Sequence, residues 1–339
     1  MYIASLITPS NRALNYSKRS IDSGVNFVKS TPGFSYCVSN NNTLDNSKIE
    51  YINSINCGDV KAVNADNESG AENWVNAIRL CESMYVGVIG DDDFIYSHDE
   101  VSGWDYSEGI SGYRPNTVIW QSGLGITRCD NFEVAGGTPL ERVSEFMSKA
   151  NGNNLTFYSF MRRDLCWKLY DFCNQYHPFA SAGYYDWAMT LAYCAAGKIL
   201  REPAITLVYD NRNWRGSSVD VARGVARLFQ KGGYPEVLAN HLNLLLAVDA
   251  YVLIRAVSRI RDDEEIEKAA RFSCMSYLNA YLKSLSPEDR ELYKVGNSLA
   301  GSRNFQDVID RCVYMIGIIC PDALSRYANY VVAGRHGFQ

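Results

Sequence analysis

The chain has 339 residues, 47% of them hydrophobic, and a formal net charge of -5. This length and composition allow a sizeable buried core and favour two domains, or one large domain with an appendage. The modest negative charge gives no support to nucleic acid or an anionic membrane surface as the partner. Ten cysteines without a Cys-x-x-Cys pair favour reduced, mostly buried thiols over a zinc site or a disulfide framework, so a cytoplasmic location is expected.

The N-terminal part of the chain alternates between strand-like and helix-like patterns. Repeats of this length predict a Rossmann-like α/β fold, in which a mostly parallel sheet carries helices on both faces. Ligands of such sheets bind at the carboxyl ends of the strands, and polar turns follow each strand here. The expected strands are residues 2–8, 34–39, 60–64 and 85–89, and the expected helices are 13–24, 47–55 and 71–82.

The middle of the chain gives a weaker pattern. Residues 102–115 are rich in glycine and aromatic residues, which favours a loop. A strand at 199–208 contains Pro203, which is typical of an edge strand. Gly197 is expected to cap the helix before it. The other expected elements are strands at 117–122 and 155–162 and helices at 139–149, 164–173 and 184–194.

From about Val219 onward the pattern is helical, with expected helices at 221–230, 235–260 and 263–285. We therefore expect an α/β domain at 1–218 and an all-helical domain at 219–339. The apolar run 242–257 contains Asp249 and Arg255 and is too short to span a bilayer, so a buried helix is predicted and no transmembrane segment is expected. The first strand begins almost at Met1, so no signal peptide is expected either.

Three adjacent carboxylates, Asp91, Asp92 and Asp93, follow the expected strand at 85–89. Adjacent anions repel one another, so the edge of a buried core is a costly place for them unless a cation is present. Carboxylate oxygens are preferred ligands of hard divalent cations such as Mg²⁺ or Mn²⁺. The alternative is an acidic turn that ends the strand, because Asp is a common turn residue.

Four sequence blocks, in the same order over residues 1–217, resemble those of GT-A fold glycosyltransferases of the large family 2 type. The first is Thr8-Pro9-Ser10-Asn11-Arg12, which is similar to a Pro-x-x-Asn-Arg turn after the first strand. The second, 64–70, is similar to an Asn-x-x-Gly turn that ends in Gly70. The third is the Asp-x-Asp motif at 91–93, and the fourth is Tyr185-Asp186-Trp187 at the start of a helix.

The resemblance implies a nucleotide-sugar donor at the sheet edge. Asp91 would lie near the ribose and the cation, Asp93 would contact the cation directly, and Asp92 would orient them. Asn40 and Asn41 stand where the family usually has an acidic residue that contacts the base, and Asp66 is the alternative for that contact. The remaining donor-binding residues that the resemblance implies are Thr8, Pro9, Ser10, Arg12, Gly70 and, toward the diphosphate, Arg212 and Arg215.

Asp186 is the candidate general base. Family 2 enzymes invert the anomeric centre, which requires a carboxylate near the acceptor hydroxyl, on the face opposite the leaving group. The alternative is a helix N-terminal residue, where a negative charge is favourable in any protein. Five aromatic residues are candidates for sugar stacking, although each is also a candidate core residue: Trp104, Tyr106, Tyr113, Trp120 and Trp187.

The sequence therefore predicts a metal-dependent glycosyltransferase that uses a nucleoside diphosphate sugar, UDP-linked by default, and a glycan or glycoconjugate acceptor. A nucleic-acid acceptor is disfavoured by the net charge. The helical region is expected to bind the acceptor, a partner or a second copy of the chain. The alternatives are a catalytically inactive binding module and a nucleotidyltransferase, although the turn 8–12 lacks the glycines typical of the latter.

Overall fold

The computed structural model describes residues 2–65, 69–101, 103–211, 218–258 and 263–336. The chain forms two compact units: unit 1 contains Met1–Ala135, Lys149–Asp171 and Gly197–Arg215, and unit 2 contains Gly136–Ser148, Phe172–Ala196 and Gly216–Gln339. The last boundary lies near the expected one at 218, but two earlier segments belong to the helical unit. One of them holds α6 (Asp186–Ala196), which is apolar on nearly all sides and packs on α8 (Leu242–Ala256).

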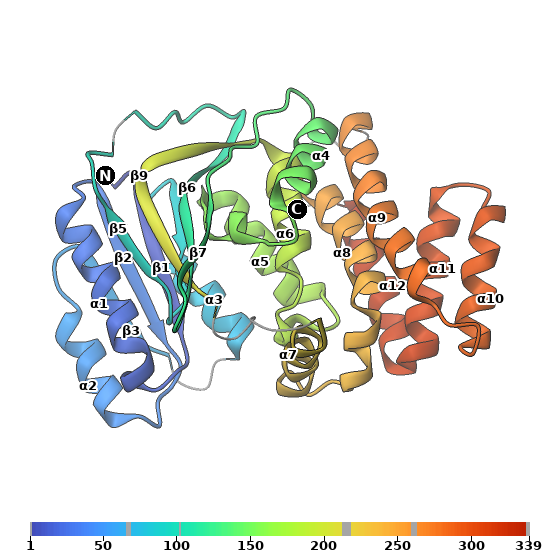
Figure 1. Ribbon diagram of the computed structural model, residues 1–339, viewed down its shortest axis with the longest axis horizontal. Coiled ribbons are helices and arrows are strands. Elements are labelled where there is room, and N and C mark those ends of the chain that lie inside the picture. The colour runs from blue at the N-terminus through green and yellow to red at the C-terminus, as the bar shows by residue number, and fades with distance from the viewer. Residues whose placement is uncertain (1, 66–68, 102, 212–217, 259–262, 337–339) are drawn as a thin grey trace. The chain divides into compact units, whose positions relative to one another are not determined.

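Unit 1 is built on a sheet of nine described strands in the order β3-β2-β1-β4-β8-β6-β9-β5, with β7 paired to β6 (Figure 1). Strands β3, β2, β1 and β4 run parallel, as expected, whereas β8 runs antiparallel to both β4 and β6, so the whole sheet is mixed. The strands are β1 Ala4–Ser10, β2 Phe34–Asn40, β3 Val60–Asn64, β4 Tyr85–Val88, β5 Phe94–Ser97, β6 Ile110–Gln121, β7 Gly125–Asp130, β8 Phe160–Arg162 and β9 Lys198–Asp210.

Helices cover both faces of this sheet, which confirms the expected α/β class. Helices α1 (Leu14–Ser30) and α2 (Asn46–Ile55) lie on one side and α3 (Gly70–Arg79) on the other (Figure 1). Helix α3 begins with a capping box. The Glu72 backbone nitrogen donates to Ser69 Oγ, and the Ser69 backbone nitrogen donates to Glu72 Oε2. The first part of α5 (Arg163–Tyr176) also belongs to unit 1 and contributes Tyr170, which stacks on Trp74 of α3.

The core of unit 1 contains two of the aromatic residues considered for sugar stacking. Trp104 and Tyr113 stack on each other with ring centroids 4.4 Å apart, and both are buried. Trp104 also donates from Nε1 to Glu202 Oε2 at 2.6 Å and meets Phe160 edge-on. These two rings are therefore core residues and do not form a sugar platform.

Several expected elements of unit 1 have different bounds. Strand β6 begins at Ile110, inside the segment expected to be a loop, and the expected strand 155–162 divides into the 3₁₀ helix η1 (Leu155–Tyr158) and β8. Strand β9 is not an edge strand, because it lies between β6 and β5, and Pro203 falls within a register shift where the β6–β9 ladder is interrupted. Gly197 is required for close packing, since a Cβ there would lie 2.8 Å from the Ser111 backbone nitrogen.

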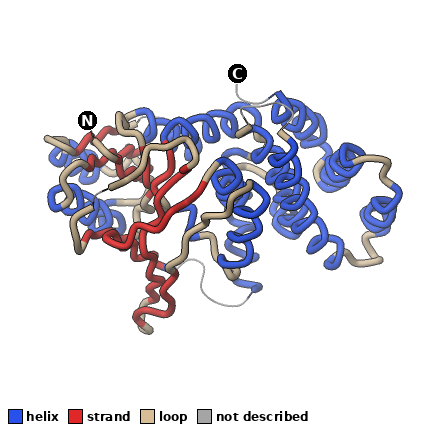
Figure 2. Tube along the Cα trace, turned by 90° about the horizontal axis from the view of Figure 1, so that it is seen from above, coloured by secondary structure: helices blue, strands red, loops and turns tan. Residues whose placement is uncertain are grey.

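The described elements of unit 2 are helical, as Figure 2 shows. Its apolar centre is α8, whose residues from Leu244 to Ile254 are all buried. Together with the preceding turn, α8 is long and apolar enough to cross a membrane, but 67% of that window is buried inside the protein, as in a core helix. The other helices are α4 (Pro139–Ala150, mostly in unit 2), α7 (Ser218–Lys231), α9 (Glu264–Ser284), α10 (Arg290–Ser298), α11 (Phe305–Ile319) and α12 (Leu324–His336), with 3₁₀ turns η2 (Ala180–Ala182), η4 (Glu236–His241), η5 (Leu299–Gly301) and η6 (Pro321–Ala323).

Candidate functional site

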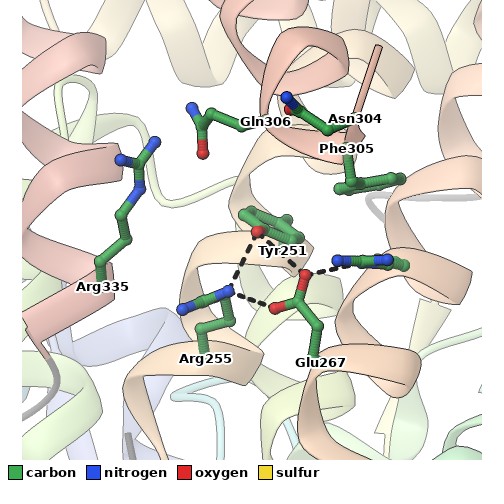
Figure 3. Close-up of a pocket in the computed structure, with 8 residues that line it drawn as sticks. Tyr251, Arg255, Glu267, Asn304, Phe305, Gln306 and Arg335 are labelled. Carbon is green, nitrogen blue, oxygen red and sulfur yellow. Dashed lines mark hydrogen bonds and ion pairs between the residues drawn. The ribbon is translucent and has the colours of Figure 1, made fainter. Parts of the chain in front are cut away.

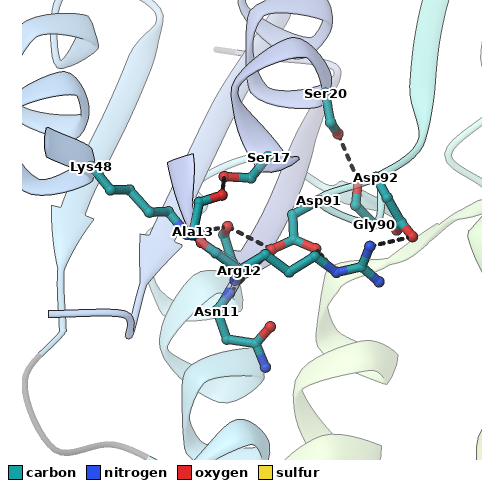
Figure 4. A network of polar contacts seen from close by, with 10 residues as sticks. Asn11, Arg12, Ala13, Ser17, Ser20, Lys48, Gly90, Asp91 and Asp92 are labelled. Atoms are coloured by element: carbon teal, nitrogen blue, oxygen red, sulfur yellow. Dashed lines mark hydrogen bonds and ion pairs between the residues drawn. The ribbon is translucent and has the colours of Figure 1, made fainter. Parts of the chain in front are cut away.

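The carboxyl ends of β1 and β4 lie side by side in the sheet, and their turns contact each other. Asp91 Oδ2 accepts hydrogen bonds from Ser10 Oγ at 2.8 Å, from the Arg12 backbone nitrogen at 3.1 Å and from the Asn11 backbone nitrogen at 3.2 Å. The other carboxylate oxygen, Oδ1, lies 3.0 Å from Arg12 Nε. Figure 4 shows this convergence. Asp91 therefore holds the β1–α1 turn in place. Its two oxygens already accept four donors, which is about as many as a carboxylate can accept.

Arg12 bridges two of the three carboxylates. Its Nε pairs with Asp91 and its Nη1 donates to Asp92 Oδ2 at 2.5 Å. Burial acts to lower the pKa of Arg12, but the negative charges of Asp91 and Asp92 outweigh it and leave that pKa raised. Burial raises the pKa of Asp92, although Arg12 acts in the opposite direction. Arg12 therefore holds the acidic turn together by charge as well as by hydrogen bonds.

Asp93 is buried and lies beside the end of β9. Its Oδ1 accepts a hydrogen bond from the Asp210 backbone nitrogen at 2.9 Å. Burial, followed by the charge of Asp92, raises the pKa of Asp93 to about 8. A Cβ at Gly90 would lie 2.6 Å from Asp93 Oδ2 and 3.1 Å from Asp92 Oδ1, so only glycine leaves space for both carboxylates there. The ends of β4 and β9 thus hold a carboxylate that is costly to ionise without a nearby cation.

Lys48 of α2 also belongs to this network, and it was not among the residues predicted from the sequence. Its side chain is fully buried and Nζ donates to Ser10 Oγ at 2.7 Å and to the Arg12 carbonyl oxygen at 2.5 Å (Figure 4). Burial lowers the pKa of Lys48 to about 8, against the effect of Asp91. One signal was available: Lys48 lies one helical turn before Ile52, the other buried residue of α2.

Replacing Lys48 with methionine is expected to lower the free energy of unfolding by about 1–2 kcal/mol at pH 7, because the Arg12 carbonyl and Ser10 hydroxyl lose their donor. The pKa of Lys48 is depressed in the folded state, so the pH-dependent part of its contribution is full above pH 10.5 and is lost as the pH falls through about 8, whereas its hydrogen bonds remain at pH 7. The difference in stability between wild type and Lys48→Met should therefore grow from pH 8 to pH 10. Urea denaturation measures this, with the exposed Lys29→Met as control; a pH-independent difference would contradict the burial of the ammonium group.

The other predicted donor-binding residues of unit 1 lie near this network but face different ways. Thr8 Oγ1 is buried and hydrogen-bonded to Tyr36 Oη at 2.7 Å, so its side chain belongs to the core. Asn40 is also buried, and its Nδ2 donates to Asn64 Oδ1 at 2.8 Å. These two side chains are therefore used within the sheet, which argues against direct ligand contact by Thr8 or Asn40. Pro9 is partly exposed, and so is Asn41, whose backbone nitrogen donates to the Ser10 carbonyl oxygen at 3.0 Å.

Three of the predicted residues lie outside the described part of the chain: Asp66, Arg212 and Arg215. Gly70 is the first residue of α3 and is exposed, and a Cβ there would meet no atom of the described residues within 4 Å. Nothing in the described part of its surroundings therefore requires glycine.

Asp186 lies in unit 2, whereas the acidic turn lies in unit 1. It is the first residue of α6, is partly exposed, and its backbone carbonyl accepts a hydrogen bond from Thr190 Oγ1 at 3.0 Å. Burial, and then the charge of Asp186, raises the pKa of Tyr277 on α9. Asp186 thus lies at a helix N-terminus, which agrees with the alternative that it is only a helix N-terminal residue. It is also close enough to Tyr277 for its charge to affect that hydroxyl.

The fit of a divalent cation to the acidic turn depends on which oxygens are already engaged. Both oxygens of Asp91 accept protein donors, so a metal contact by Asp91 would displace some of them. Asp93 Oδ2 and Asp92 Oδ1 lie 2.6 and 3.1 Å from the position that a Cβ at Gly90 would take, so both are near the same point. Within the described ranges, no three His, Cys, Asp or Glu side chains are arranged to hold a metal. The donor set therefore fits a cation held mainly by Asp93, with ligand and water oxygens supplying the remaining positions.

No protein-family model matches the chain, and no curated protein does either. Among solved structures, it is similar to TarS of S. aureus (13% identity, 98% of this chain and 55% of that chain, TM-score 0.43), so it spans about half of that chain's length. It is also similar to TarS 1-349 in complex with UDP (16%, 99% and 89%, TM-score 0.44). A third is the mannosyltransferase PcManGT from Pyrobaculum calidifontis in complex with GDP-Man and Mn²⁺ (12%, 93% and 85%, TM-score 0.36).

Proposed function

We propose that this protein is a glycosyltransferase that takes a sugar from a nucleoside diphosphate, UDP by default, and transfers it to an acceptor hydroxyl. The observation that carries the proposal is the contact between two turns at the carboxyl ends of β1 and β4. The turn Ser10–Arg12 and the carboxylates of Asp91 and Asp92 form one charged network there, with Asp93 next to it, in the place where α/β sheets bind their ligands. The four sequence blocks that resemble family 2 enzymes include both of these turns.

The charges of this network suit a diphosphate that is bound together with a cation. Among the described residues, the three carboxylates of this turn and the nearby charge of Asp210 outnumber the two cations that contact the network, Arg12 and Lys48. Such an excess attracts a divalent cation, which we assign chiefly to Asp93. When bound, Mn²⁺ or Mg²⁺ would stabilise the negative charge that develops on the leaving diphosphate. Arg12 and the fixed Ser10–Arg12 turn would position the nucleotide.

In the proposed transfer, the bond between the anomeric carbon and the diphosphate oxygen breaks. A new bond forms from that carbon to the acceptor oxygen, and the hydroxyl proton passes to Asp186 as the general base. Attack from the face opposite the leaving group inverts the anomeric centre. The acceptor is proposed to be a glycan or glycoconjugate, and a cytoplasmic location and self-association through unit 2 remain predictions from the sequence.

Asp186→Asn is expected to lower kcat for transfer by at least about a hundredfold, because an amide cannot accept the hydroxyl proton. Donor affinity, measured by titration calorimetry, should change little, since the base acts on the acceptor. A matched control is Asp164→Asn, which removes an exposed carboxylate from the start of another helix. If Asp186→Asn transfers sugar at the wild-type rate, Asp186 is only a helix N-terminal residue.

The proposed function is tested by a thermal-shift screen of nucleotide sugars with Mn²⁺ or with EDTA. A ligand that binds only the native state raises the apparent stability. We expect a shift of a few degrees with one nucleoside diphosphate sugar, dependent on the cation. Coupled detection of released nucleoside diphosphate then measures turnover. No shift with any nucleotide sugar would contradict the proposal and favour the inactive binding module.

A further inference from the structure

A pocket of about 410 Å³ lies within unit 2, far along the chain from the acidic turn (Figure 3). Residues from α8, α9, α12 and the start of α11 line it. Of the described lining residues, three are arginines, Arg255, Arg271 and Arg335, and one is a carboxylate, Glu267. The remaining lining residues are the aromatic Tyr251 and Phe305 and the amides Asn304 and Gln306.

Two of the three guanidinium groups share the single carboxylate. Arg271 Nε donates to Glu267 Oε1 at 2.7 Å, and Arg255 Nη1 donates to Glu267 Oε2 and, at 3.1 Å, to Tyr251 Oη. Each arginine also lies over an aromatic ring: the Arg255 guanidinium is 5.5 Å from the centre of Tyr251 and that of Arg271 is 5.3 Å from the centre of Phe305. These contacts hold both forks in place and leave most of their N–H donors available.

Arg335 approaches the same space from α12 and is exposed (Figure 3). Within the described ranges, no hydrogen bond or ion pair engages its guanidinium. The described lining therefore carries three positive charges against one carboxylate, a balance that favours binding of an anion.

We propose that this pocket binds a phosphate ester. Guanidinium forks from three different helices surround the space, and a tetrahedral phosphate can offer oxygens in several directions, whereas a carboxylate offers two in one plane. The pocket is large enough to hold a phosphate together with part of the sugar, polyol or lipid headgroup that carries it. Asn304 Oδ1 accepts from the Asp307 backbone nitrogen and Gln306 Nε2 donates to Asp310 Oδ1, so we assign Asn304 Nδ2 and Gln306 Oε1 to the uncharged part of such a ligand. This proposal does not depend on glycosyl transfer.

The test measures binding of glycerol 3-phosphate to the full chain by ³¹P NMR and by calorimetry, in EDTA at low ionic strength. Arg335→Gln should weaken binding at least about tenfold, because it removes one charge-assisted contact with the ligand. The substitution breaks no hydrogen bond or ion pair of the guanidinium within the described protein. Arg290→Gln, which removes an equally exposed arginine from α10 outside the pocket, should bind like wild type. Arg335→Lys should retain part of the affinity.

A parallel arm distinguishes a soluble ester from a lipid headgroup by sedimentation with vesicles of phosphatidylglycerol or of phosphatidylcholine. Arg335-dependent binding in either arm supports the pocket, and the arm in which it occurs identifies the source. The proposal is overturned if phosphate binds equally to wild type and Arg335→Gln, if neither arm shows binding, or if succinate binds as tightly as glycerol 3-phosphate.

Discussion

Asp91→Ala is expected to abolish donor binding, with a loss in affinity of at least about a hundredfold, and to lower the free energy of unfolding by about 2–4 kcal/mol. The change removes the acceptor of three hydrogen bonds from the β1–α1 turn and the ion pair to Arg12 Nε. The turn would then lose the geometry that we assign to nucleotide binding. Urea denaturation and titration calorimetry measure the two effects.

Asp92→Ala is the matched control for this change. Asp92 belongs to the same acidic turn and pairs with Arg12 through Nη1, whereas Asp91 also accepts from Ser10 and from the backbone of the β1–α1 turn. We expect a loss of about 1 kcal/mol in stability and a smaller loss of donor affinity. If Asp91→Ala and Asp92→Ala behave alike, Asp91 does not organise the turn.

Asp93→Asn is expected to lower transfer at least about a thousandfold, because the carboxylate that we assign to the cation is lost. The same variant has an opposite effect on metal-free stability. The pKa of Asp93 is raised in the folded state, so its contribution is full below about pH 4 and is lost as the pH rises through about 8. In EDTA at pH 8, Asp93→Asn should therefore be more stable than wild type, by on the order of 5 kcal/mol, and near pH 4 the two should be similar.

Mn²⁺ should remove this difference by stabilising wild type alone. Asparagine can still accept the hydrogen bond from the Asp210 backbone nitrogen, so the local backbone is retained. Thermal unfolding with EDTA and with Mn²⁺, at several pH values, gives the comparison. Equal stabilisation of both proteins by Mn²⁺ would show that Asp93 does not hold the cation.

The parallel half of the sheet could be predicted from sequence because its signals are local. The strand at 60–64 has the expected bounds, and β2 and α2 differ from expectation by one residue. Parallel pairing then places the turns after β1 and β4 at one edge, which is why Ser10, Arg12 and Asp91 could be grouped before any contact was known. Hydrophobic periodicity and turn composition carry this information.

The mixed half of the sheet could be predicted only in part: the strands expected at 117–122 and 199–208 lie within β6 and β9, but tertiary contacts override local composition elsewhere. Gly112 and Pro115 make residues 102–115 resemble a loop, yet Gly112 is required where β6 approaches Met161 of β8. Pro203 indicates an edge strand, but the irregular register of β9 accommodates it inside the sheet. Both features depend on partners distant in the sequence.

Lys48 shows the same limit within the site. A lysine in a short amphipathic helix normally indicates a solvated face. Here the carbonyl of Arg12 and the hydroxyl of Ser10, both from a turn that precedes the helix by more than thirty residues, make its burial possible. Asp91 likewise accepts hydrogen bonds that hold the β1–α1 turn, and its position in an Asp-x-Asp motif did not predict this role.

The most direct test of the donor site is a calorimetric titration of wild type and Asp93→Asn with UDP and UDP-sugars, each with Mn²⁺ and with EDTA. We predict that at least one nucleotide sugar binds wild type in Mn²⁺, and that binding is weakened at least about tenfold both by EDTA and by Asp93→Asn. Equal binding under all four conditions, or no binding of any nucleotide to wild type, would contradict the assignment of the acidic turn to a cation-dependent nucleotide-sugar site.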